Sequence, residues 1–253
     1  MKALITGASS GIGRDFAREL SKRGYDLVLA ARRVPRMEEL ARQLQTHVSV
    51  VGADLSLKDQ CYDLYRQVRG EEIEVLINCA GFGVFGPFDE TDLERELNLI
   101  NVNIRAVHIL TKLFYRDFKQ RDSGHILNVS SSAAFQPGPL LSSYYASKAY
   151  VLRLTQALAE ELRRDGSRVY IGALCPGPVH TEFDSVADVR FSVKGLSSEY
   201  VARYAVQKMF ARKTLIVPGF TMKAALFGER FLPESAVVRI AYQMQKRKTR
   251  PGP

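Results

Sequence analysis

The sequence has few of the residues and segments that mark several common classes of protein. Its 253 residues include three cysteines, which lie far apart at Cys61, Cys79 and Cys175. An odd, scattered set is typical of free thiols and excludes a disulfide framework. No apolar run reaches the length of a membrane span. Zinc-finger spacing and RNA-recognition signatures are also missing, so the sequence favours no nucleic-acid partner.

Metal-binding patterns and a targeting segment are equally lacking. The four histidines share no ligand spacing, so we interpret them as structural or surface residues and expect no metal site; they are His47, His108, His125 and His180. The chain begins "MKALITGASSGIG", in which one lysine is followed directly by a predicted strand. This start leaves no room for a signal peptide, so we expect a cytoplasmic protein.

Acidic residues are scarce in the last quarter of the chain. Residues 190–253 hold 13 Lys or Arg and 3 Asp or Glu, whereas the net charge of the whole chain is +9. The basic character therefore belongs to the C-terminal part, which includes an extension over about residues 219–253. Two interpretations stay open: a solvated surface with a loose tail, or a surface for an anionic partner such as a phosphate-bearing substrate, an acidic carrier protein or anionic lipid.

Short apolar runs, by contrast, recur along the chain. They show little alternation, which is typical of strands buried on both faces of a parallel sheet. The seven runs are 2–6, 26–30, 48–53, 74–78, 125–130, 169–175 and 214–218. Apolar residues at helical spacing predict helices between them, among others at 13–24, 93–120 and 144–165. This alternation predicts one α/β domain over residues 1–253, a Rossmann-type doubly wound sheet of about seven mostly parallel strands flanked by helices.

A doubly wound sheet binds ligands at the carboxyl ends of its strands. After the first strand comes "TGASSGIG", with glycines at Gly7, Gly11 and Gly13. Glycines permit a tight turn and a close approach of the backbone, and the next helix directs its N-terminal N–H groups at a phosphate. The loop therefore predicts a cradle for a dinucleotide pyrophosphate. It has no lysine for a γ-phosphate, which argues against a P-loop.

The loop after the second strand lacks the carboxylate that an NAD site needs. NAD-binding sheets place Asp or Glu there to hold the ribose 2′-hydroxyl, whereas this chain has Ala31, Arg32 and Arg33. Because a guanidinium forms charge-assisted hydrogen bonds to a 2′-phosphate, the sequence predicts NADP(H) in preference to NAD(H). After the third strand, Asp54 is the expected acceptor for the adenine amino group.

The ends of the fourth and fifth strands carry further polar residues, and a tyrosine and a lysine follow the fifth strand at defined intervals. The fourth strand ends in "NCAGFG", where the Asn78 amide is expected to tie neighbouring strands. The fifth ends in "NVSSSA", and Ser131 stands thirteen residues before Tyr144, which has Lys148 four residues beyond it. This spacing puts the tyrosine and the lysine on the same face of a helix. The adjacent Tyr145 has an alanine at that spacing, so Tyr144 is the predicted reactive tyrosine.

Together these motifs resemble the short-chain dehydrogenase/reductase family over about residues 1–181. The matching segments are "TGASSGIG" for its glycine loop, "NCAG" for N-N-A-G, "VNIRAV" for the helical asparagine, "NVSSSA" for the serine strand, "YYASK" for Y-x-x-x-K and "CPGPVHT" for P-G-x-V-x-T. Cys79 replaces the second asparagine of N-N-A-G. Ser10 stands where NADP-dependent members often have a basic residue, so the NADP prediction depends on Arg32 and Arg33.

The resemblance implies hydride transfer between NADP(H) and a carbonyl or alcohol, commonly by a homodimer or homotetramer. Tyr144 is implied to exchange the proton and Ser131 to bind the substrate oxygen. Lys148 is implied to hold the nicotinamide ribose, and Asn103 to hold a water that links Lys148 to solvent. The residues expected to contact the cofactor are Gly7, Ser9, Ser10, Gly11, Ile12, Gly13, Arg32, Arg33, Asp54, Leu55, Asn78, Ala80, Gly81, Tyr144, Lys148, Pro176, Gly177, Val179 and Thr181.

The chemistry requires a tyrosine that exchanges a proton near neutral pH. A free phenol has a pKa of about 10. The ammonium of Lys148, together with NADP⁺ in the oxidative direction, is expected to lower the pKa of Tyr144 toward the operating pH, where proton transfer is most effective.

An apolar substrate pocket is predicted from two segments. Its expected residues are Phe82, Val84, Phe85, Phe88, Phe183, Phe191 and Val193. A less specific resemblance to long-chain ketoacyl and hydroxysteroid reductases supports an apolar ketone or ketoacyl substrate. A catalytically silent NADP(H)-binding regulator is the alternative, because fold alone does not decide function. Such a regulator has no need of all four catalytic residues, so the intact set favours the enzyme.

Near the end of the chain, Val237, Ile240, Ala241 and Met244 share one face of a predicted helix. Two interpretations stay open. The face packs in the core or between subunits, or it belongs to a basic apolar flap that makes weak contact with a membrane or an acidic partner, or that covers long acyl chains.

Overall fold

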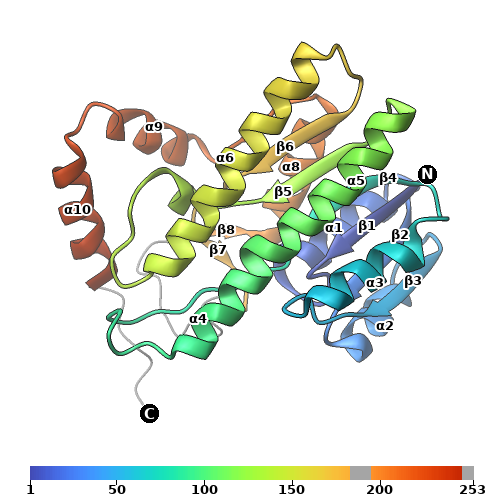
Figure 1. Ribbon diagram of the computed structural model, residues 1–253, viewed down its shortest axis with the longest axis horizontal. Coiled ribbons are helices and arrows are strands. Elements are labelled where there is room, and N and C mark those ends of the chain that lie inside the picture. The colour runs from blue at the N-terminus through green and yellow to red at the C-terminus, as the bar shows by residue number, and fades with distance from the viewer. Residues whose placement is uncertain (183–194, 247–253) are drawn as a thin grey trace.

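The centre of the molecule is a parallel sheet (Figure 1). A computed structural model describes residues 1–182 and 195–246, and within these ranges the sheet has seven strands in the order β3-β2-β1-β4-β5-β6-β9. The strands are β1 Lys2–Thr6, β2 Asp26–Ala31, β3 Val48–Gly52, β4 Ile73–Asn78, β5 His125–Val129, β6 Tyr170–Leu174 and β9 Leu215–Ile216. The order reverses between β1 and β4, which confirms the predicted doubly wound α/β fold.

Helices cover both faces of the sheet (Figure 1). One face carries α1 (Gly11–Ser21), α2 (Val34–Ala41) and α8 (Ser198–Phe210). The other carries α3 (Lys58–Val68), α5 (Val107–Arg121) and α6 (Ser142–Arg164). Two large buried clusters therefore form, one on each side of the sheet, and a smaller third cluster contains Ala134, Leu152, Ala173, Cys175 and Val217.

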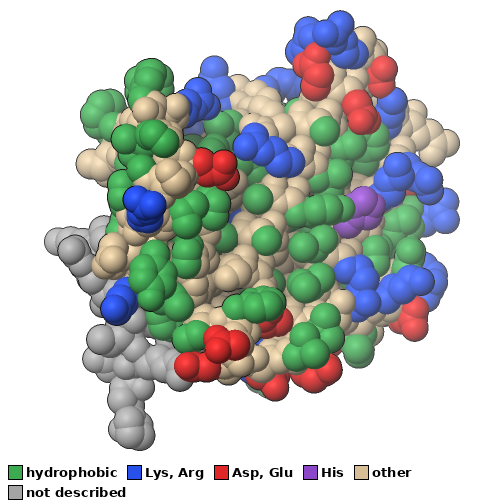
Figure 2. Space-filling model, turned by 60° about the vertical axis from the view of Figure 1, so that its left-hand side comes forward, with side chains coloured by type: hydrophobic (Ala, Val, Ile, Leu, Met, Phe, Trp, Pro, Cys, Tyr) green, Lys and Arg blue, Asp and Glu red, His purple; other side chains and the backbone are tan. Residues whose placement is uncertain are grey.

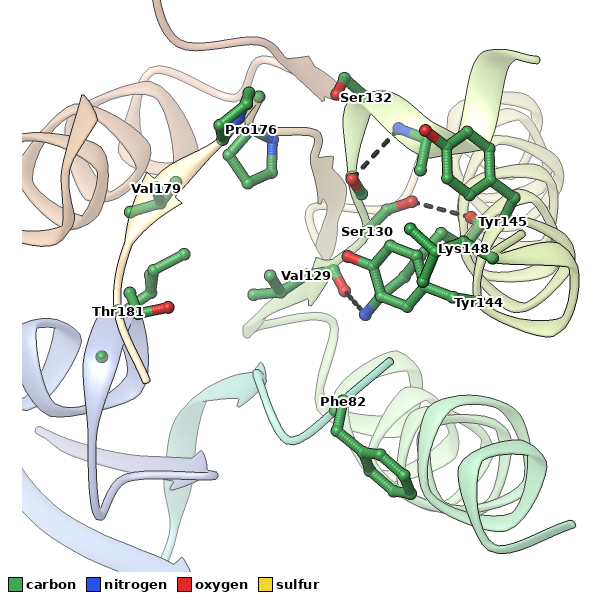
Figure 3. Close-up of a pocket in the computed structure, with 18 of the residues that line it drawn as sticks. Phe82, Val129, Ser130, Ser132, Tyr144, Tyr145, Lys148, Pro176, Val179 and Thr181 are labelled. Carbon is green, nitrogen blue, oxygen red and sulfur yellow. Dashed lines mark hydrogen bonds between the residues drawn. The ribbon is translucent and has the colours of Figure 1, made fainter. Parts of the chain in front are cut away.

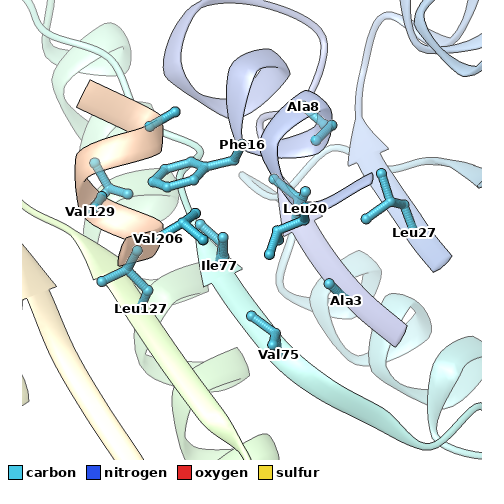
Figure 4. Packing of buried hydrophobic residues seen from close by; sticks show 14 of the residues in the cluster. Ala3, Ala8, Phe16, Leu20, Leu27, Val75, Ile77, Leu127, Val129 and Val206 are labelled. Atoms are coloured by element: carbon cyan, nitrogen blue, oxygen red, sulfur yellow. The ribbon is translucent and has the colours of Figure 1, made fainter. Parts of the chain in front are cut away.

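The strands lack alternation because each of their two faces meets one of these helical layers. In β1, Ile5 packs with α1 and α8, whereas the neighbouring Leu4 packs with α3 and α5. Figure 4 shows the first cluster, in which Phe16 of α1 lies beside Val206 of α8 above the strands. Full burial of one such side chain contributes about 1.5–3 kcal/mol, so the two layers fix the register of the strand ends where ligands bind.

The helix predicted over 93–120 is interrupted. It consists of α4 (Leu93–Ile100), a π-helix (Asn101–Ala106) and then α5. A π-helix has a wider turn than an α-helix and is frequent at functional sites. Here the π-helix contains Asn103, whose buried amide donates hydrogen bonds to groups outside its own helix.

The C-terminal helices lie beside this body rather than on the sheet. In Figure 1, α9 (Phe220–Glu229) and α10 (Glu234–Lys246) form a pair at the left edge, and α9 has no buried residue. A short parallel pair, β7 (Val179–His180) with β8 (Leu196–Ser197), and a 3-10 helix (Ser132–Phe135) complete the described elements. Among the described helices, none has the length and apolar character needed to cross a membrane.

Candidate active site

A cavity of about 860 Å³ opens at the carboxyl ends of the strands, where the order of the sheet reverses. Figure 3 shows part of its wall, to which β5, α6 and the β7 segment contribute. Asn78 and Asn103 are buried outside its surface. The predicted residues that line it are Gly7, Ser9, Ser10, Gly11, Ile12, Gly13, Arg32, Arg33, Asp54, Leu55, Ala80, Gly81, Ser131, Tyr144, Lys148, Pro176, Gly177, Val179 and Thr181.

The loop between β1 and α1 requires its glycines for steric reasons. Gly7 has a φ of 68°, and a Cβ on Gly13 would lie 2.3 Å from the Gly7 carbonyl oxygen. The Thr6 hydroxyl holds the loop against the segment that follows β4. It accepts hydrogen bonds from the N–H groups of Cys79 and Ala80 at 3.0 and 3.2 Å. The loop thus brings the N-terminus of α1 to the cavity, where its N–H groups suit a phosphate.

Arg33 reaches from the end of β2 across this loop. Its Nε and Nη2 donate to the hydroxyls of Ser9 and Ser10 at 3.3 and 2.7 Å, and its Nη1 donates to Glu182 at 2.8 Å. Arg36 pairs with the same carboxylate, and hydrogen bonds from the two arginines lower the pKa of Glu182. A guanidinium therefore stands over Ser10, the position at which the sequence itself lacks a basic residue.

Tyr144 and Lys148 of α6 face the end of β5 (Figure 3). The Tyr144 phenol shares a hydrogen bond with the Ser131 hydroxyl, and Lys148 Nζ lies 5.7 Å from the centroid of the Tyr144 ring. Lys148 Nζ donates to the Val129 carbonyl at 3.0 Å, and the Ser130 hydroxyl donates to the Lys148 carbonyl at 2.8 Å. These bonds hold α6 against β5, so the three groups expected to react stand at one place.

Burial moves the pKa of the two titratable groups in opposite directions. It raises the pKa of Tyr144 to about 12, partly opposed by the hydrogen bond with Ser131. It lowers the pKa of Lys148 to about 8. The prediction that the pKa of Tyr144 lies below that of a free phenol is wrong for the protein alone, because the cost of a buried phenolate outweighs any stabilisation by nearby groups. The Tyr144 phenol is therefore neutral at physiological pH and has a proton that it could donate.

Asn103 is buried, and both ends of its amide are bonded. Oδ1 accepts from the Phe82 N–H at 3.1 Å, while Nδ2 donates to the Phe82 carbonyl at 2.9 Å and to the Ser147 hydroxyl at 3.0 Å. A Cβ on Gly81 would lie 3.0 Å from Asn103 Oδ1 and 3.2 Å from Lys148 Nζ. Asn103 thus positions the loop that runs past Lys148; that it holds a water there stays a prediction.

Asn78 joins strands and helices beneath the cavity. Its Nδ2 donates to Thr111 at 3.1 Å and to Asn128 at 2.9 Å, and the Asn128 amide donates to Thr155 at 2.9 Å. This chain of bonds connects β4, α5, β5 and α6, as expected for a residue that ties strands. A direct contact between Asn78 and the cofactor stays a prediction.

The wall opposite the glycine loop is mainly apolar and comes from α9, α10 and the turn between them. Its apolar residues are Met222, Ala225, Leu226, Leu232, Val237, Ile240, Ala241 and Met244. The helical face predicted near the C-terminus therefore lines the cavity. The segment after β4 that holds four of the predicted pocket residues contributes less than predicted. Phe82 lines the cavity, whereas Val84, Phe85 and Phe88 do not, and Phe88 is 69% exposed. Phe183, Phe191 and Val193 lie outside the described residues.

Three residues that take part in this site were not predicted. Ser147 follows Tyr144 by three residues, so helical spacing alone indicated the same face. Glu182 is next to the predicted Thr181, but its pairing with Arg33 spans 149 residues of sequence. Gln245 follows Ala241 by four residues, so helical spacing placed it on the predicted apolar face. Its hydrogen bond to Tyr145, across 100 residues of sequence, left no signal.

Comparisons with known proteins agree with this geometry. The model of the short chain dehydrogenase family matches residues 1–188. An uncharacterized oxidoreductase of Staphylococcus epidermidis is 35% identical over 189 residues, which cover 74% of this chain and 81% of that protein. A very-long-chain 3-oxoacyl-CoA reductase of Anas platyrhynchos is 33% identical over 198 residues, which cover 75% of this chain and 63% of that protein.

Among solved structures, a short-chain dehydrogenase from Sphingobium yanoikuyae in complex with NADPH superposes with a TM-score of 0.82 at 32% identity. The match covers 90% of this chain and 93% of that one. Both the sequence motifs and the fold are thus shared with the same group of proteins. The chain belongs to the short-chain dehydrogenase/reductase family of oxidoreductases.

Proposed function

We propose that this protein is an NADPH-dependent reductase of an apolar ketone or ketoacyl compound. The observation that carries the proposal is the convergence of Ser131, Tyr144 and Lys148 on one cavity beside the glycine loop. Membership of the family supports action on carbonyl and alcohol groups. The protonated state of Tyr144 favours reduction as the working direction.

In the proposed reaction, the side chains handle one proton and one developing charge. NADPH supplies the hydride when bound. The Ser131 hydroxyl donates a hydrogen bond to the substrate oxygen as negative charge develops on it. The Tyr144 phenol, with a pKa of about 12, still holds its proton at neutral pH and gives it to that oxygen. The Lys148 ammonium then stabilises the phenolate that remains. Asn103, through Phe82 and Ser147, keeps these groups in position.

The cofactor preference is supported by Arg33 and Arg32, which line the cavity next to the glycine loop. The loop suits a pyrophosphate, since the backbone at Gly13 packs so closely on Gly7 that there is no room for a Cβ there. Arg33 donates to both loop serines and so provides positive charge where a 2′-phosphate is expected. The solved relative from Sphingobium yanoikuyae, described as an NADPH complex, is consistent with this preference.

Replacing Arg33 tests the preference. Hydrogen bonds to charged groups contribute about 1.5–3 kcal/mol, so Arg33→Ala is expected to weaken NADPH binding about 10- to 100-fold. NADH lacks the 2′-phosphate, and its affinity is expected to stay nearly constant. Fluorescence titration of both cofactors measures the difference. An equal loss for NADH and NADPH would contradict the proposed role of Arg33.

The substrate class is supported by the apolar wall of α9 and α10. Because this wall lines the same cavity as Tyr144, it suits the carbon skeleton of an apolar ketone. The relative from Anas platyrhynchos carries the name of a very-long-chain 3-oxoacyl-CoA reductase, which agrees with this class. Small polar sugars or polyols as the only substrates would contradict it.

The decisive experiment follows NADPH oxidation with ketones, aldehydes and ketoacyl thioesters of graded chain length. We expect kcat/KM to rise with chain length. Tyr144→Phe removes the proton donor and is expected to lower kcat/KM about 10²- to 10⁴-fold. Tyr242→Phe is the control, since Tyr242 is exposed and does not line the cavity. Retained activity in Tyr144→Phe would overturn the mechanism. Tight NADPH binding without turnover of any compound would favour the silent regulator instead.

We further propose a homodimer or homotetramer formed through α4 and α6. These helices expose Leu93, Leu97, Ile100 and Tyr150. A second copy of the chain would remove these apolar side chains from water. Light scattering of the purified protein is expected to give a multiple of the 28.4 kDa chain mass, and Leu97→Glu is expected to shift it toward that of one chain. A monomeric wild type would contradict the assembly.

The outer side of α9 and α10 supports a weak contact with an anionic membrane. Phe220, Phe227 and Phe231 are exposed there, and Lys223 and Arg230 are exposed beside them. Figure 2 shows hydrophobic side chains gathered on this side of the molecule, with Lys and Arg side chains among them. Apolar groups flanked by basic ones are typical of surfaces that bind the headgroup region of anionic lipid.

A further inference from the structure

Tyr145, the neighbour of the reactive tyrosine, faces a different part of the same cavity. The two rings lie 6.2 Å apart at an angle of 74°, and Figure 3 shows their hydroxyls pointing to different places. The ring of Tyr145 is held against the backbone at Gly138, where a Cβ would lie 2.2 Å from it. Tyr145 is therefore a fixed part of the wall.

A polar pair links this tyrosine to the C-terminal helix. The Gln245 side-chain amide, on α10, donates its Nε2–H to the Tyr145 hydroxyl, and Tyr145 also shares a hydrogen bond with Gln136. All three residues line the cavity. Three separate segments thus converge: the end of the 3-10 helix, the start of α6 and the end of α10.

The other end of the Gln245 amide is the unusual feature. Gln245 is only 2% exposed, and among the described residues its Oε1 has no hydrogen-bond partner. A buried acceptor without a partner costs about 1–3 kcal/mol. A purely structural clamp for α10 explains the bond from Nε2 but leaves this cost in place. A ligand with a hydrogen-bond donor at this point would remove it.

The surroundings define which ligand fits. Val237, Ala241 and Met244 of α10 and Leu226 of α9 line the same part of the wall as Gln245. The polar pair is thus set in a mainly apolar wall, which also carries the carboxyl of Glu229 at the end of α9. Tyr144, the predicted reactive residue, is the sequence neighbour of Tyr145. A ligand that reaches both tyrosines needs a carbonyl at one point, an apolar skeleton, and a second polar group a few bonds away.

We propose that Tyr145 and Gln245 form a polar subsite that binds a hydroxyl group of the substrate. The hydroxyl donates to Gln245 Oε1 while the carbonyl stands at Tyr144 and Ser131. The preferred substrate is then a hydroxyketone with an otherwise apolar skeleton, rather than a plain alkyl ketone. This inference rests on the proposed reductase function and narrows its substrate class. Gln245 is a specificity residue and not part of the proton transfer.

The test compares matched pairs of long-chain ketones, with and without one hydroxyl at graded distances from the carbonyl. At one distance we expect the wild type to prefer the hydroxylated member about tenfold or more in kcat/KM, because one satisfied hydrogen bond replaces a buried unpaired oxygen. Gln245→Met keeps the length of the side chain but removes both polar ends. It is expected to lower kcat/KM for the hydroxyketone, raise it for the plain ketone, and bring their ratio near one.

Two variants that each remove one tyrosine hydroxyl serve as a test and its matched control. Tyr145→Phe keeps the ring on Gly138 and removes the hydroxyl that positions Gln245, so the preference is expected to shrink. Tyr242→Phe removes a hydroxyl from an exposed position of α10 and is expected to leave it unchanged. A role limited to clamping α10 would lower kcat/KM for both ketones together, and that result would overturn the subsite. So would a wild type with no preference at any hydroxyl position.

Failure of the reductase proposal can be told apart from failure of the subsite. If no ketone is turned over, calorimetry can compare the binding of the matching diols and plain alcohols. A preference for the diol that disappears in Gln245→Met would keep the subsite and reject the reductase. Equal binding of diol and plain alcohol would reject the subsite as well.

Discussion

The two halves of the cavity are built in different ways. The cofactor half is formed by strand ends and by the glycine loop, in which Gly13 leaves no space for a Cβ. Its buried polar side chains, such as Asn103 and Lys148, donate hydrogen bonds to other segments of the chain. The substrate half is formed by α9, which has no buried residue, and by α10, which buries only Val237, Ala241 and Gln245.

This difference separates the shared chemistry from the individual substrate. The backbone geometry of the cofactor half follows from sheet packing, so the residues that form it can change little without a loss of the reaction. The helices of the substrate half rest on few buried side chains, so their lining can change with a small cost to the fold. Substitutions in the two halves are therefore expected to change cofactor binding, activity and stability to different extents.

The largest contrast is expected between two glycine-to-alanine substitutions in helices. In Gly13→Ala, the new Cβ would lie 2.3 Å from the Gly7 carbonyl oxygen, so the loop must move. Overpacking of this kind costs about 1–3 kcal/mol, and NADPH affinity is expected to fall about 10- to 100-fold. Gly228→Ala, in α9, meets no atom within 4 Å and should bind NADPH like the wild type.

Titration of NADPH and thermal unfolding of both variants measure this contrast. Alanine stabilises a helix relative to glycine by about 1 kcal/mol, so Gly228→Ala is expected to unfold at the same or a slightly higher temperature. If Gly13→Ala bound NADPH normally, the steric account of the loop would be wrong. If Gly228→Ala abolished activity, the substrate half would be as tightly constrained as the cofactor half.

Most residues that the sequence assigned to the cofactor half line one cavity, because the determinants of their positions are local. Glycine spacing, strand ends and the interval between Tyr144 and Lys148 are properties of short segments. The substrate half depends on contacts between distant segments, such as Tyr145 with Gln245, which no local pattern encodes. The interruption of the helix around Asn103 was missed for a similar reason, since its amide is satisfied by Phe82 and Ser147 rather than by neighbours in the helix.

The next effect is a pH dependence that belongs to the cofactor half alone. Burial lowers the pKa of Lys148 to about 8, so its ammonium is fully present below that pH and is lost as the pH rises through it. Because the ammonium stabilises the Tyr144 phenolate, kcat/KM for reduction is expected to fall about tenfold per pH unit above 8. The pH profile of Gln245→Met, in the other half, should have the same midpoint. A flat wild-type profile from pH 7 to 10 would contradict the role of Lys148.

A smaller effect is expected where Glu182 competes for Arg33. Its carboxylate pairs with Arg33 and Arg36 at an exposed site, and such pairs contribute about 0.2–1 kcal/mol. Glu182→Gln removes the competitor and its repulsion of a 2′-phosphate, so NADPH affinity is expected to rise a few-fold while NADH affinity stays constant. Fluorescence titration of both cofactors provides the measurement.

Glu160→Gln is the matched control for this substitution. Glu160 also pairs with two arginines, Arg163 and Arg164, but it lies near the far end of α6 and does not line the cavity. It is expected to leave both affinities unchanged. Weaker NADPH binding in Glu182→Gln would show that the carboxylate orients Arg33 for the phosphate instead of competing with it.

The smallest effect is expected on the outer surface of the substrate half. Phe220, Phe227 and Phe231 are exposed, so replacing all three with Ser should cost little stability. The change is expected to reduce co-sedimentation with phosphatidylglycerol vesicles a few-fold, because interfacial binding scales with the apolar area buried in the headgroup region. Leu57→Ser with Phe88→Ser, at exposed positions outside α9 and α10, is the matched control and should bind vesicles like the wild type. Binding that is weak in all three proteins, or equally strong to neutral phosphatidylcholine, would assign these phenylalanines to contacts other than an anionic membrane.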